Sequence, residues 1–301
     1  MRIVLTNLSN KLFENSRFRL NESARKFGIT DIRSYDFDEL KSTAFYRDNR
    51  EIFDLPKGIG YWLWKPYIIL ETMKTLSDGD IVIYSDCGIE IENKLETLIS
   101  VCSEVQPVLL FGNGNFTNSK WTKRDCFILM DCDNELFWKG AHCDAAFSLF
   151  KKNGMVLQFL SEWLEYARDK RILTDLKNTC GKNNLPDFTE HRWDQSILSL
   201  LAQKYRVPFY RMPTQFGNHY KSYPYRRENE FNCINQYKSV PVNFYAIIPY
   251  YNSDYPQLLN HHRTKGNQNP AKNSSFYRAK RITGKMMNYL KKILRNPFSK
   301  P

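Results

Sequence analysis

The chain has 301 residues, of which 42% are hydrophobic, 25% charged and 15% aromatic, a composition typical of a globular protein with a sizeable core. No stretch reaches the ~18 consecutive apolar residues of a membrane-spanning helix, and the apolar run Ile3–Leu5 is too short for a secretion signal. The formal net charge is +12, but nine Lys and Arg and no Asp or Glu lie between Lys272 and Lys300, so a basic nucleic-acid-binding face on the folded domain is not expected.

Seven cysteines are scattered along the chain without a C-x-x-C pair. An odd number without paired spacing predicts reduced thiols in a cytosolic protein, and neither a disulfide framework nor a zinc site. The 18 Tyr and 20 Phe indicate a surface that stacks on carbohydrate or nucleobase, although a thick core also uses these residues.

The first half of the chain alternates short apolar runs with amphipathic stretches. Pro66 falls in the first turn of one predicted helix, where proline is tolerated. Strands alternating with helices at this spacing predict an α/β domain with a largely parallel sheet. The predicted strands are 2–7, 29–37, 81–86 and 107–113, and the predicted helices are 18–28, 65–76 and 92–104.

The second half is more helical, with helices predicted at 153–169 and 193–204. Residues 252–275 are rich in Asn, His, Pro and Ser, and are predicted to link a domain at 1–251 to a basic tail at 276–301. In the tail, apolar residues recur at helical spacing among Lys and Arg. Two interpretations follow: an amphipathic helix on an anionic membrane, or a solvated and frayed extension.

The apolar strand at 81–86 ends in Asp86, two residues before Gly88. Ligands of open α/β sheets bind beyond the carboxyl ends of the strands. A carboxylate there can hold a divalent metal that bridges nucleotide phosphates, and a glycine permits close backbone approach. The alternative is a carboxylate that only caps a helix or a turn.

An aromatic cluster of Tyr61, Trp62 and Trp64 directly precedes Lys65 at a predicted helix start. A lysine in that position can contact a diphosphate at the positive end of the helix. We expect one of the three aromatic rings to stack on a base or sugar while the others pack in the core. The alternative for Lys65 is an ordinary solvated surface lysine.

A second candidate cluster is "EHRWDQSILSLLAQK", in which Asp194 and Gln195 begin a helix just after His191 and Arg192. An aspartate at a helix start is often a cap. The stretch "KWTKRDCF" at 120–127 is either a lid or acceptor edge, or a solvated loop, and no catalytic role is assigned to it.

The segment Tyr84-Ser85-Asp86-Cys87-Gly88 resembles the aspartate motif of GT-A-fold glycosyltransferases, in which a strand ends in Asp-x-Asp. More closely, "GYWLWKP", "YSDCG", "WTKRDCF" and "HRWDQSILSLL", in this order, resemble bacterial glycosyltransferases of capsule and lipopolysaccharide gene clusters. The resemblance spans roughly residues 1–225. It implies a GT-A-like, Rossmann-type, mostly parallel sheet flanked by helices, to which the residue pattern adds a helical C-terminal part and the basic amphipathic tail.

The resemblance also implies roles for individual residues. Asp194 is implied to be the general base that takes the proton of an acceptor hydroxyl, with Gln195 as its catalytic neighbour. The residues implied to bind the donor are Thr6, Trp64, Lys65, Tyr84, Asp86, Gly88, His191 and Arg192.

A divalent metal, Mn²⁺ or Mg²⁺, is the cofactor that the resemblance implies. Asp86 matches the first aspartate of the motif, but Gly88 stands where the second would be. His219, in "QFGNHYKSYP", is similar to the late histidine of glycogenin-like transferases and is the implied second ligand. Because a single carboxylate binds a divalent ion weakly, the alternative is a metal-free variant that uses cationic side chains.

The function implied is that of a glycosyltransferase of the hexosyltransferase class, moving a sugar from a nucleotide-sugar donor to a saccharide or lipid-linked saccharide acceptor in surface polysaccharide synthesis. With the tail at 276–301, it predicts a cytoplasmic protein peripherally associated with the inner face of the membrane, with no nucleic acid as partner. Two alternatives stay open. One is a nucleotidyl- or phosphoryl-group transferase, although no G-x-x-x-x-G-K-[ST] loop is present; the other is a non-enzymatic basic membrane or nucleic-acid adaptor.

Overall fold

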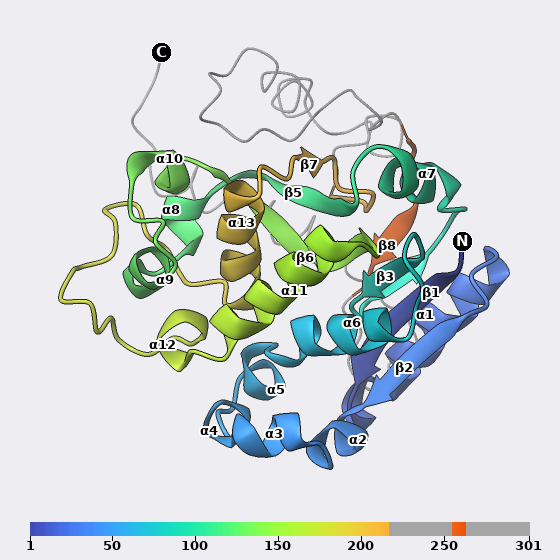
Figure 1. The fold of residues 1–301 in the computed structure, drawn as a ribbon, viewed down its shortest axis with the longest axis horizontal. Helices are drawn as coiled ribbons and strands as arrows, with labels where there is room; N and C mark the ends of the chain where they lie inside the picture. The colour runs from blue at the N-terminus through green and yellow to red at the C-terminus, as the bar shows by residue number, and fades with distance from the viewer. Residues whose placement is uncertain (217–254, 263–301) are drawn as a thin grey trace, which may run out of the picture.

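The fold is built on a mostly parallel sheet, seen in a computed structural model that describes residues 1–216 and 255–262. The sheet has six strands in the order β2-β1-β3-β6-β5-β7 (Figure 1). Strand β6 runs antiparallel to both of its neighbours, whereas every other pair is parallel. The strands are β1 (Ile3–Ser9), β2 (Ile32–Asp36), β3 (Ile81–Ser85), β5 (Val108–Thr117), β6 (Ala141–Lys151) and β7 (Phe209–Tyr210).

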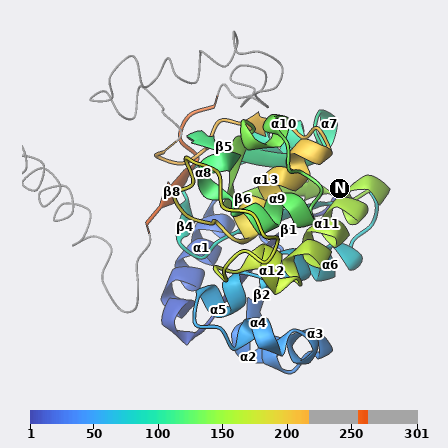
Figure 2. The ribbon, with the colours of Figure 1, turned by 90° about the vertical axis from the view of Figure 1, so that its left-hand side faces the viewer.

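Helices cover both faces of this sheet, which confirms the predicted α/β class with a Rossmann-type, mostly parallel sheet flanked by helices. On one face lie α6 (Trp64–Lys74), α11 (Gly154–Ala167) and α13 (Asp194–Lys204), and on the other α1 (Glu14–Lys26) and α7 (Glu96–Glu104). The shorter helices are η1 (Lys11–Phe13), α2 (Phe37–Lys41), α3 (Ala44–Asp48), α4 (Arg50–Phe53), α5 (Gly58–Tyr61), α8 (Asn118–Trp121), α9 (Arg124–Leu129), α10 (Glu135–Trp138) and α12 (Lys170–Leu173). Figure 2 shows the same ribbon turned by 90° about the vertical axis.

Two hydrophobic cores lie on opposite faces of the sheet. The larger packs α6, α11 and α13 against the sheet, and the smaller packs α1 and α7. All five residues of β3 are buried, because both faces of a central strand are covered, and this is why its sequence is a continuous apolar run. Among the described residues, no helix is long and apolar enough to cross a membrane.

A second, two-stranded sheet pairs β4 (Ile89–Ile91) with β8 (Leu259–His261), which run antiparallel. Strand β8 therefore lies inside the segment that its composition assigned to a linker. Tyr255 and Leu258, just ahead of β8, are buried in the smaller core. The apolar residues at 255–259 drive this packing, while the Asn- and His-rich sequence around them is what favoured a linker. The tail at 276–301 lies outside the described residues.

The stretch at 120–127 is not a solvated loop, because it runs through the end of α8 into α9. Lys123 and Asp125 are buried. Both oxygens of Asp125 accept hydrogen bonds from the backbone of Thr179 and Cys180, at 2.8–2.9 Å. Lys123 Nζ donates to the carbonyl of Leu176 at 2.6 Å. Lys123 and Asp125 therefore hold the loop that precedes α13 in place through hydrogen bonds to its backbone.

Candidate active site

A buried lysine joins two carboxylates at the carboxyl end of β3. Lys65, on the first turn of α6, is only 4% exposed. Its Nζ lies 3.2 Å from Asp86 Oδ1, just past β3, and 3.1 Å from Asp194 Oδ2, at the start of α13. It also donates a hydrogen bond to the carbonyl of Ala145 on β6, at 3.1 Å. The fold thus brings together three of the residues implied by the resemblance, and we call Lys65, Asp86 and Asp194 the Lys65 centre.

Asp86 is held at the end of β3 by its own backbone. Its N–H donates to the carbonyl of Ala146 at 2.7 Å, which continues the β3–β6 pairing beyond the strand. The hydroxyl of Tyr84, two residues earlier, donates to Asp86 Oδ1. The side chain of Asp86 is still 29% exposed, so this carboxylate is the member of the Lys65 centre that faces solvent.

The protonation states in the Lys65 centre follow from burial and pairing. Burial raises the pKa of Asp194 to about 6, although the neighbouring Lys65 ammonium acts in the opposite direction. Burial alone would lower the pKa of Lys65, but the ion pairs with Asp194 and Asp86 outweigh it and raise that pKa. Burial also raises the pKa of Tyr84, so its hydroxyl keeps the proton that it donates to Asp86. At neutral pH the centre therefore holds one ammonium between carboxylates.

Asp194 does not act as a helix cap. The residue at the N-cap position of α13 is Trp193, and it makes no side-chain capping bond. The side chain of Asp194 instead points to Lys65 and is only 4% exposed. Gln195, half-buried beside it, has its amide nitrogen 3.1 Å from Nδ1 of His142.

Strained backbone concentrates around the Lys65 centre. Of the six non-glycine residues with positive φ in the described ranges, four lie in two segments that meet here: Ile59, Tyr61, Trp62 and Trp193. Trp193 has φ 53° and ψ −121°, a conformation that L residues rarely adopt. Such strain costs roughly 1–3 kcal/mol per residue and persists only where packing enforces it, often at functional sites.

The strained segments place two tryptophans against each other. The rings of Trp62 and Trp193 stack with centroids 4.9 Å apart and planes at 23°. Nζ of Lys65 lies 6.0 Å from the Trp62 ring centroid, so the stack borders the Lys65 centre. Tyr61 and Trp64 are buried in the larger core, and Trp62 is the one member of the predicted aromatic cluster that is only half-buried.

His191 and Arg192, both implied donor-binding residues, lie in different surroundings. His191 is buried: its Nδ1 accepts from the N–H of Lys123 at 3.3 Å, and its Nε2 lies 2.8 Å from the carbonyl of Ile172. Burial lowers its pKa to about 3, so the ring is neutral. The guanidinium of Arg192 is partly exposed, pairs with Glu190 at 2.5 Å and lies over the ring of Trp121.

The remaining implied residues lie further from the centre or outside the described ranges. Thr6 is fully buried in the middle of β1, where its hydroxyl donates to the carbonyl of Arg33 at 3.2 Å and accepts from Thr72 at 3.1 Å. The carbonyl of Gly88 accepts from the N–H of His262 at 2.8 Å. His219 lies outside the described residues.

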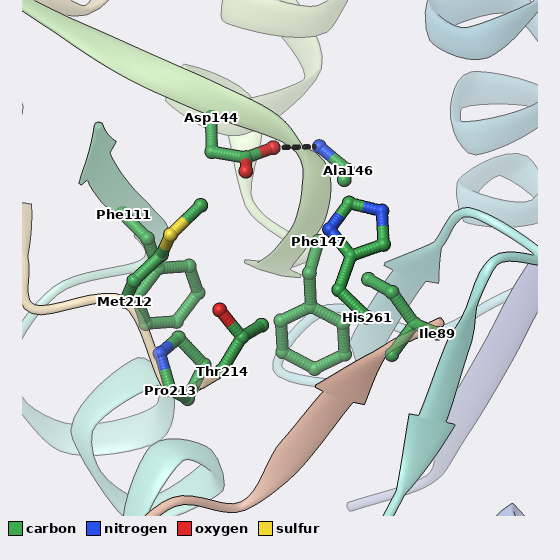
Figure 3. Close-up of a pocket in the computed structure, with 9 residues that line it drawn as sticks. All are labelled: Ile89, Phe111, Asp144, Ala146, Phe147, Met212, Pro213, Thr214 and His261. Carbon is green, nitrogen blue, oxygen red and sulfur yellow. Dashed lines mark hydrogen bonds between the residues drawn. The ribbon is translucent and has the colours of Figure 1, made fainter. Parts of the chain in front are cut away.

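A small pocket, partly open to solvent and with room for about one water molecule, adjoins the same end of the sheet (Figure 3). Asp144 supplies its carboxylate, which accepts from the N–H of Ala146 at 2.6 Å. Burial raises the pKa of Asp144. The pocket is close to the Lys65 centre because Ala145 and Ala146 contact Lys65 and Asp86 directly. Its lining consists of Ile89, Phe111, Asp144, Ala146, Phe147, Met212, Pro213, Thr214 and His261.

Sequence reasoning missed two polar residues of β6, His142 and Asp144. His142 is buried, its pKa is lowered to about 3 by burial, and its Nε2 has no hydrogen-bond partner among the described residues. Strand β6 runs in the reverse direction, so its first residues lie at the carboxyl end of β3. The signal available in the sequence was the pair of polar residues in the otherwise apolar run AHCDAAF.

The described residues do not fit a divalent metal. The position between the carboxylates of Asp86 and Asp194 is taken by the ammonium of Lys65. In the part of the chain that the structure describes, no group of three or more His, Cys, Asp and Glu side chains is placed to hold a metal ion. Gly88, which stands where the second aspartate of the motif would be, supplies no carboxylate.

Comparison with known proteins finds only distant structural likeness. No protein-family model and no curated protein sequence matches the chain. The bifunctional glycosyltransferase WbbM, in its apo structure, is similar with a TM-score of 0.47 and 10% identity over 88% of this chain and 46% of WbbM. Mouse xyloside xylosyltransferase 1, in its apo form, is similar with a TM-score of 0.43 and 9% identity over 87% of this chain and 98% of its own. The chain thus spans less than half the length of WbbM.

Proposed function

We propose that the protein is a glycosyltransferase that moves a sugar from a nucleotide-sugar donor to a saccharide acceptor. The observation that carries the proposal is the Lys65 centre at the carboxyl end of β3, the edge where open α/β sheets bind their ligands. The motif resemblance, whose segments contribute Lys65, Asp86 and Asp194, agrees with this placement.

Asp194 is the proposed general base. A pKa of about 6 leaves this carboxylate largely ionised at neutral pH and still basic enough to take a proton from an acceptor hydroxyl. Lys65 is a positioning residue in this scheme, because its ion pair fixes the direction of the carboxylate. Gln195, half-buried next to Asp194, is the proposed contact to the acceptor.

Asp86 and Arg192 are the proposed donor contacts. The exposed side of the Asp86 carboxylate can accept hydrogen bonds from sugar hydroxyls, and the Tyr84 hydroxyl holds it in place. The guanidinium of Arg192, with 32% of its side chain exposed, can neutralise charge on the departing diphosphate. Trp62 is the proposed stacking surface for a base or sugar ring.

The acceptor and location are a further part of the proposal. Nine Lys and Arg and no acidic residue between Lys272 and Lys300 suit attraction to an anionic membrane surface. A lipid-linked saccharide at the inner face of the membrane is the acceptor that would use such a tail, as in capsule or lipopolysaccharide synthesis. A truncation that removes 272–301 is expected to release the protein from anionic vesicles.

The test is a donor-binding and hydrolysis screen with UDP-, GDP- and CMP-sugars, read by thermal shift and by product mass. One donor is expected to raise the melting temperature and to lose a hexose. Asp86→Asn is expected to abolish the shift, whereas Asp38→Asn, at an exposed residue of α2 paired with Lys41, is the control and keeps it. Failure of every donor contradicts the function, transfer of a phosphate contradicts the reaction class, and an unchanged shift in Asp86→Asn contradicts the site.

A further inference from the structure

Three oxygens of the chain form a cation-binding site, and the ammonium of Lys65 occupies it. Three oxygens surround Nζ at 3.1–3.2 Å: the carbonyl of Ala145 and one carboxylate oxygen each from Asp86 and Asp194. The contact to the Ala145 carbonyl is a hydrogen bond, and the contacts to the two carboxylates are ion pairs. The side chain is 5% exposed, and water therefore has little access to it.

The same oxygens are those that a divalent cation prefers. Carboxylates and backbone carbonyls are the usual ligands of Mg²⁺, Mn²⁺ and Ca²⁺. These ions bind oxygen at ~2.0–2.6 Å, closer than the lysine nitrogen lies, and no such ion fits beside the ammonium without strong like-charge repulsion. Because Lys65 is held by two carboxylates, it stays charged and cannot give way by losing its proton.

We infer that Lys65 acts as the built-in cation of this centre, that donor turnover needs no divalent metal, and that Asp86 and Asp194 bind a metal only when the ammonium is removed. The statement about turnover rests on the proposed function. The statement about metal binding does not, since it concerns only the position of three side chains.

The experiment measures Mn²⁺ binding to the full chain by electron paramagnetic resonance and by thermal shift. The variant Lys65→Met keeps most of the length of the side chain and removes the charge. It is expected to bind one Mn²⁺ at least ~10-fold more tightly than the unmodified protein, a change of about 1.4 kcal/mol. The double variant Lys65→Met with Asp86→Asn is expected to lose that gain.

The matched control is Lys123→Met, which removes another buried lysine near a carboxylate. Lys123 is 3% exposed and lies 3.9 Å from Asp125, but its Nζ donates to two backbone carbonyls and it is outside the Lys65 centre. This variant is expected to bind no more Mn²⁺ than the unmodified protein. Equal gains in Lys65→Met and Lys123→Met would assign the effect to general loosening and overturn the inference.

Two further outcomes overturn it. One is specific Mn²⁺ binding by the unmodified chain that disappears in Asp86→Asn; the other is a folded Lys65→Met protein that gains no Mn²⁺ binding. Should Lys65→Met not fold, Mn²⁺ binding to Lys65→Gln and donor hydrolysis by the unmodified protein in EDTA decide the question. Hydrolysis that is unchanged in EDTA supports the inference, and hydrolysis that EDTA abolishes and Mn²⁺ restores refutes it. If no donor is hydrolysed at all, the proposed function fails while the Mn²⁺ comparison stands.

Discussion

The ammonium of Lys65 and the carboxylate of Asp194 form a buried ion pair, with 3.1 Å between Nζ and Oδ2. The two residues come from different helices, α6 and α13, which pack on the same face of the sheet. Both charges are shielded from water, so each depends on the other for compensation. The pair therefore couples the stability of the domain to the chemistry of its candidate active site.

Lys65→Met is expected to lower the free energy of unfolding by about 3–5 kcal/mol near neutral pH, because Asp194 keeps a buried charge without its cation. With the ammonium gone, the pKa of Asp194 rises further above its unfolded value, so the folded state binds a proton that the unfolded state releases. Stability of the variant is then higher at low pH and falls as pH rises through that pKa. Urea unfolding at about pH 5 and about pH 7.5 checks this.

The control is Lys74→Met, which removes an exposed lysine paired with Glu71 on the same helix. A surface pair is worth less than about 1 kcal/mol, so this variant is expected to unfold nearly as the unmodified protein does. A loss in Lys65→Met that is the same at both pH values would contradict the assignment to Asp194.

Asp194→Asn is expected to lower kcat by about 10²–10⁴-fold, the usual contribution of a general base. In the unmodified protein, turnover is expected to fall as pH drops through about 6, since protonated Asp194 cannot accept a proton. The residual turnover of Asp194→Asn is expected to lack this decrease at low pH. Full activity in Asp194→Asn together with inactivity of Asp86→Asn would contradict this role for Asp194 and would assign the general base to Asp86.

Trp62→Ala is expected to raise the KM for one substrate by roughly two- to tenfold. This change corresponds to the loss of an aromatic contact worth about 0.5–1.5 kcal/mol. Trp62→Phe keeps a ring and is expected to recover part of the loss. Phe18→Ala is the control, because this aromatic residue is 66% exposed and lies on α1, which packs on the opposite face of the sheet from α6 and α13. An unchanged KM for donor and acceptor in Trp62→Ala would remove the ring from the substrate site.

Gly60→Ala is expected to destabilise the protein by about 2–4 kcal/mol. Gly60 has φ +75°, and a Cβ there would lie 2.6 Å from the Phe53 ring and 3.0 Å from the Phe53 Cα. Gly154→Ala is the matched control: it begins α11, has ordinary φ, and its Cβ would meet nothing within 4 Å. That substitution is expected to be neutral or to stabilise by up to ~1 kcal/mol. Similar melting temperatures for the two variants would contradict the strain assigned to the turn at 58–62.

The parts of the fold that the sequence predicts are those whose pattern is local. Strand β3 is a continuous apolar run, and α11 and α13 have apolar residues at helical spacing, so each is found close to its predicted bounds. The acid at the end of β3 follows from the same pattern, because the strand ends where the apolar run ends.

The parts that the sequence does not predict depend on tertiary pairing. A lysine next to aromatic residues is as well explained by a solvated surface position, and only the approach of α13 and β3 shows that Lys65 is buried. The sequence of β6 predicts a buried strand but not its direction relative to β3. It therefore does not predict that His142 and Asp144 lie at the site. His191 resembles a donor ligand in sequence, yet both ring nitrogens contact backbone groups of the protein.

The pairing of β8 with β4 decides where the chain can be shortened. A product that stopped at residue 251, as composition alone would suggest, would remove Tyr255, Leu258 and β8. The backbone of β4, which follows directly on the Asp86 turn, would then be an uncovered strand edge beside an exposed apolar surface, a combination that promotes self-association. Expression and crystallisation trials should therefore retain the chain through at least His262.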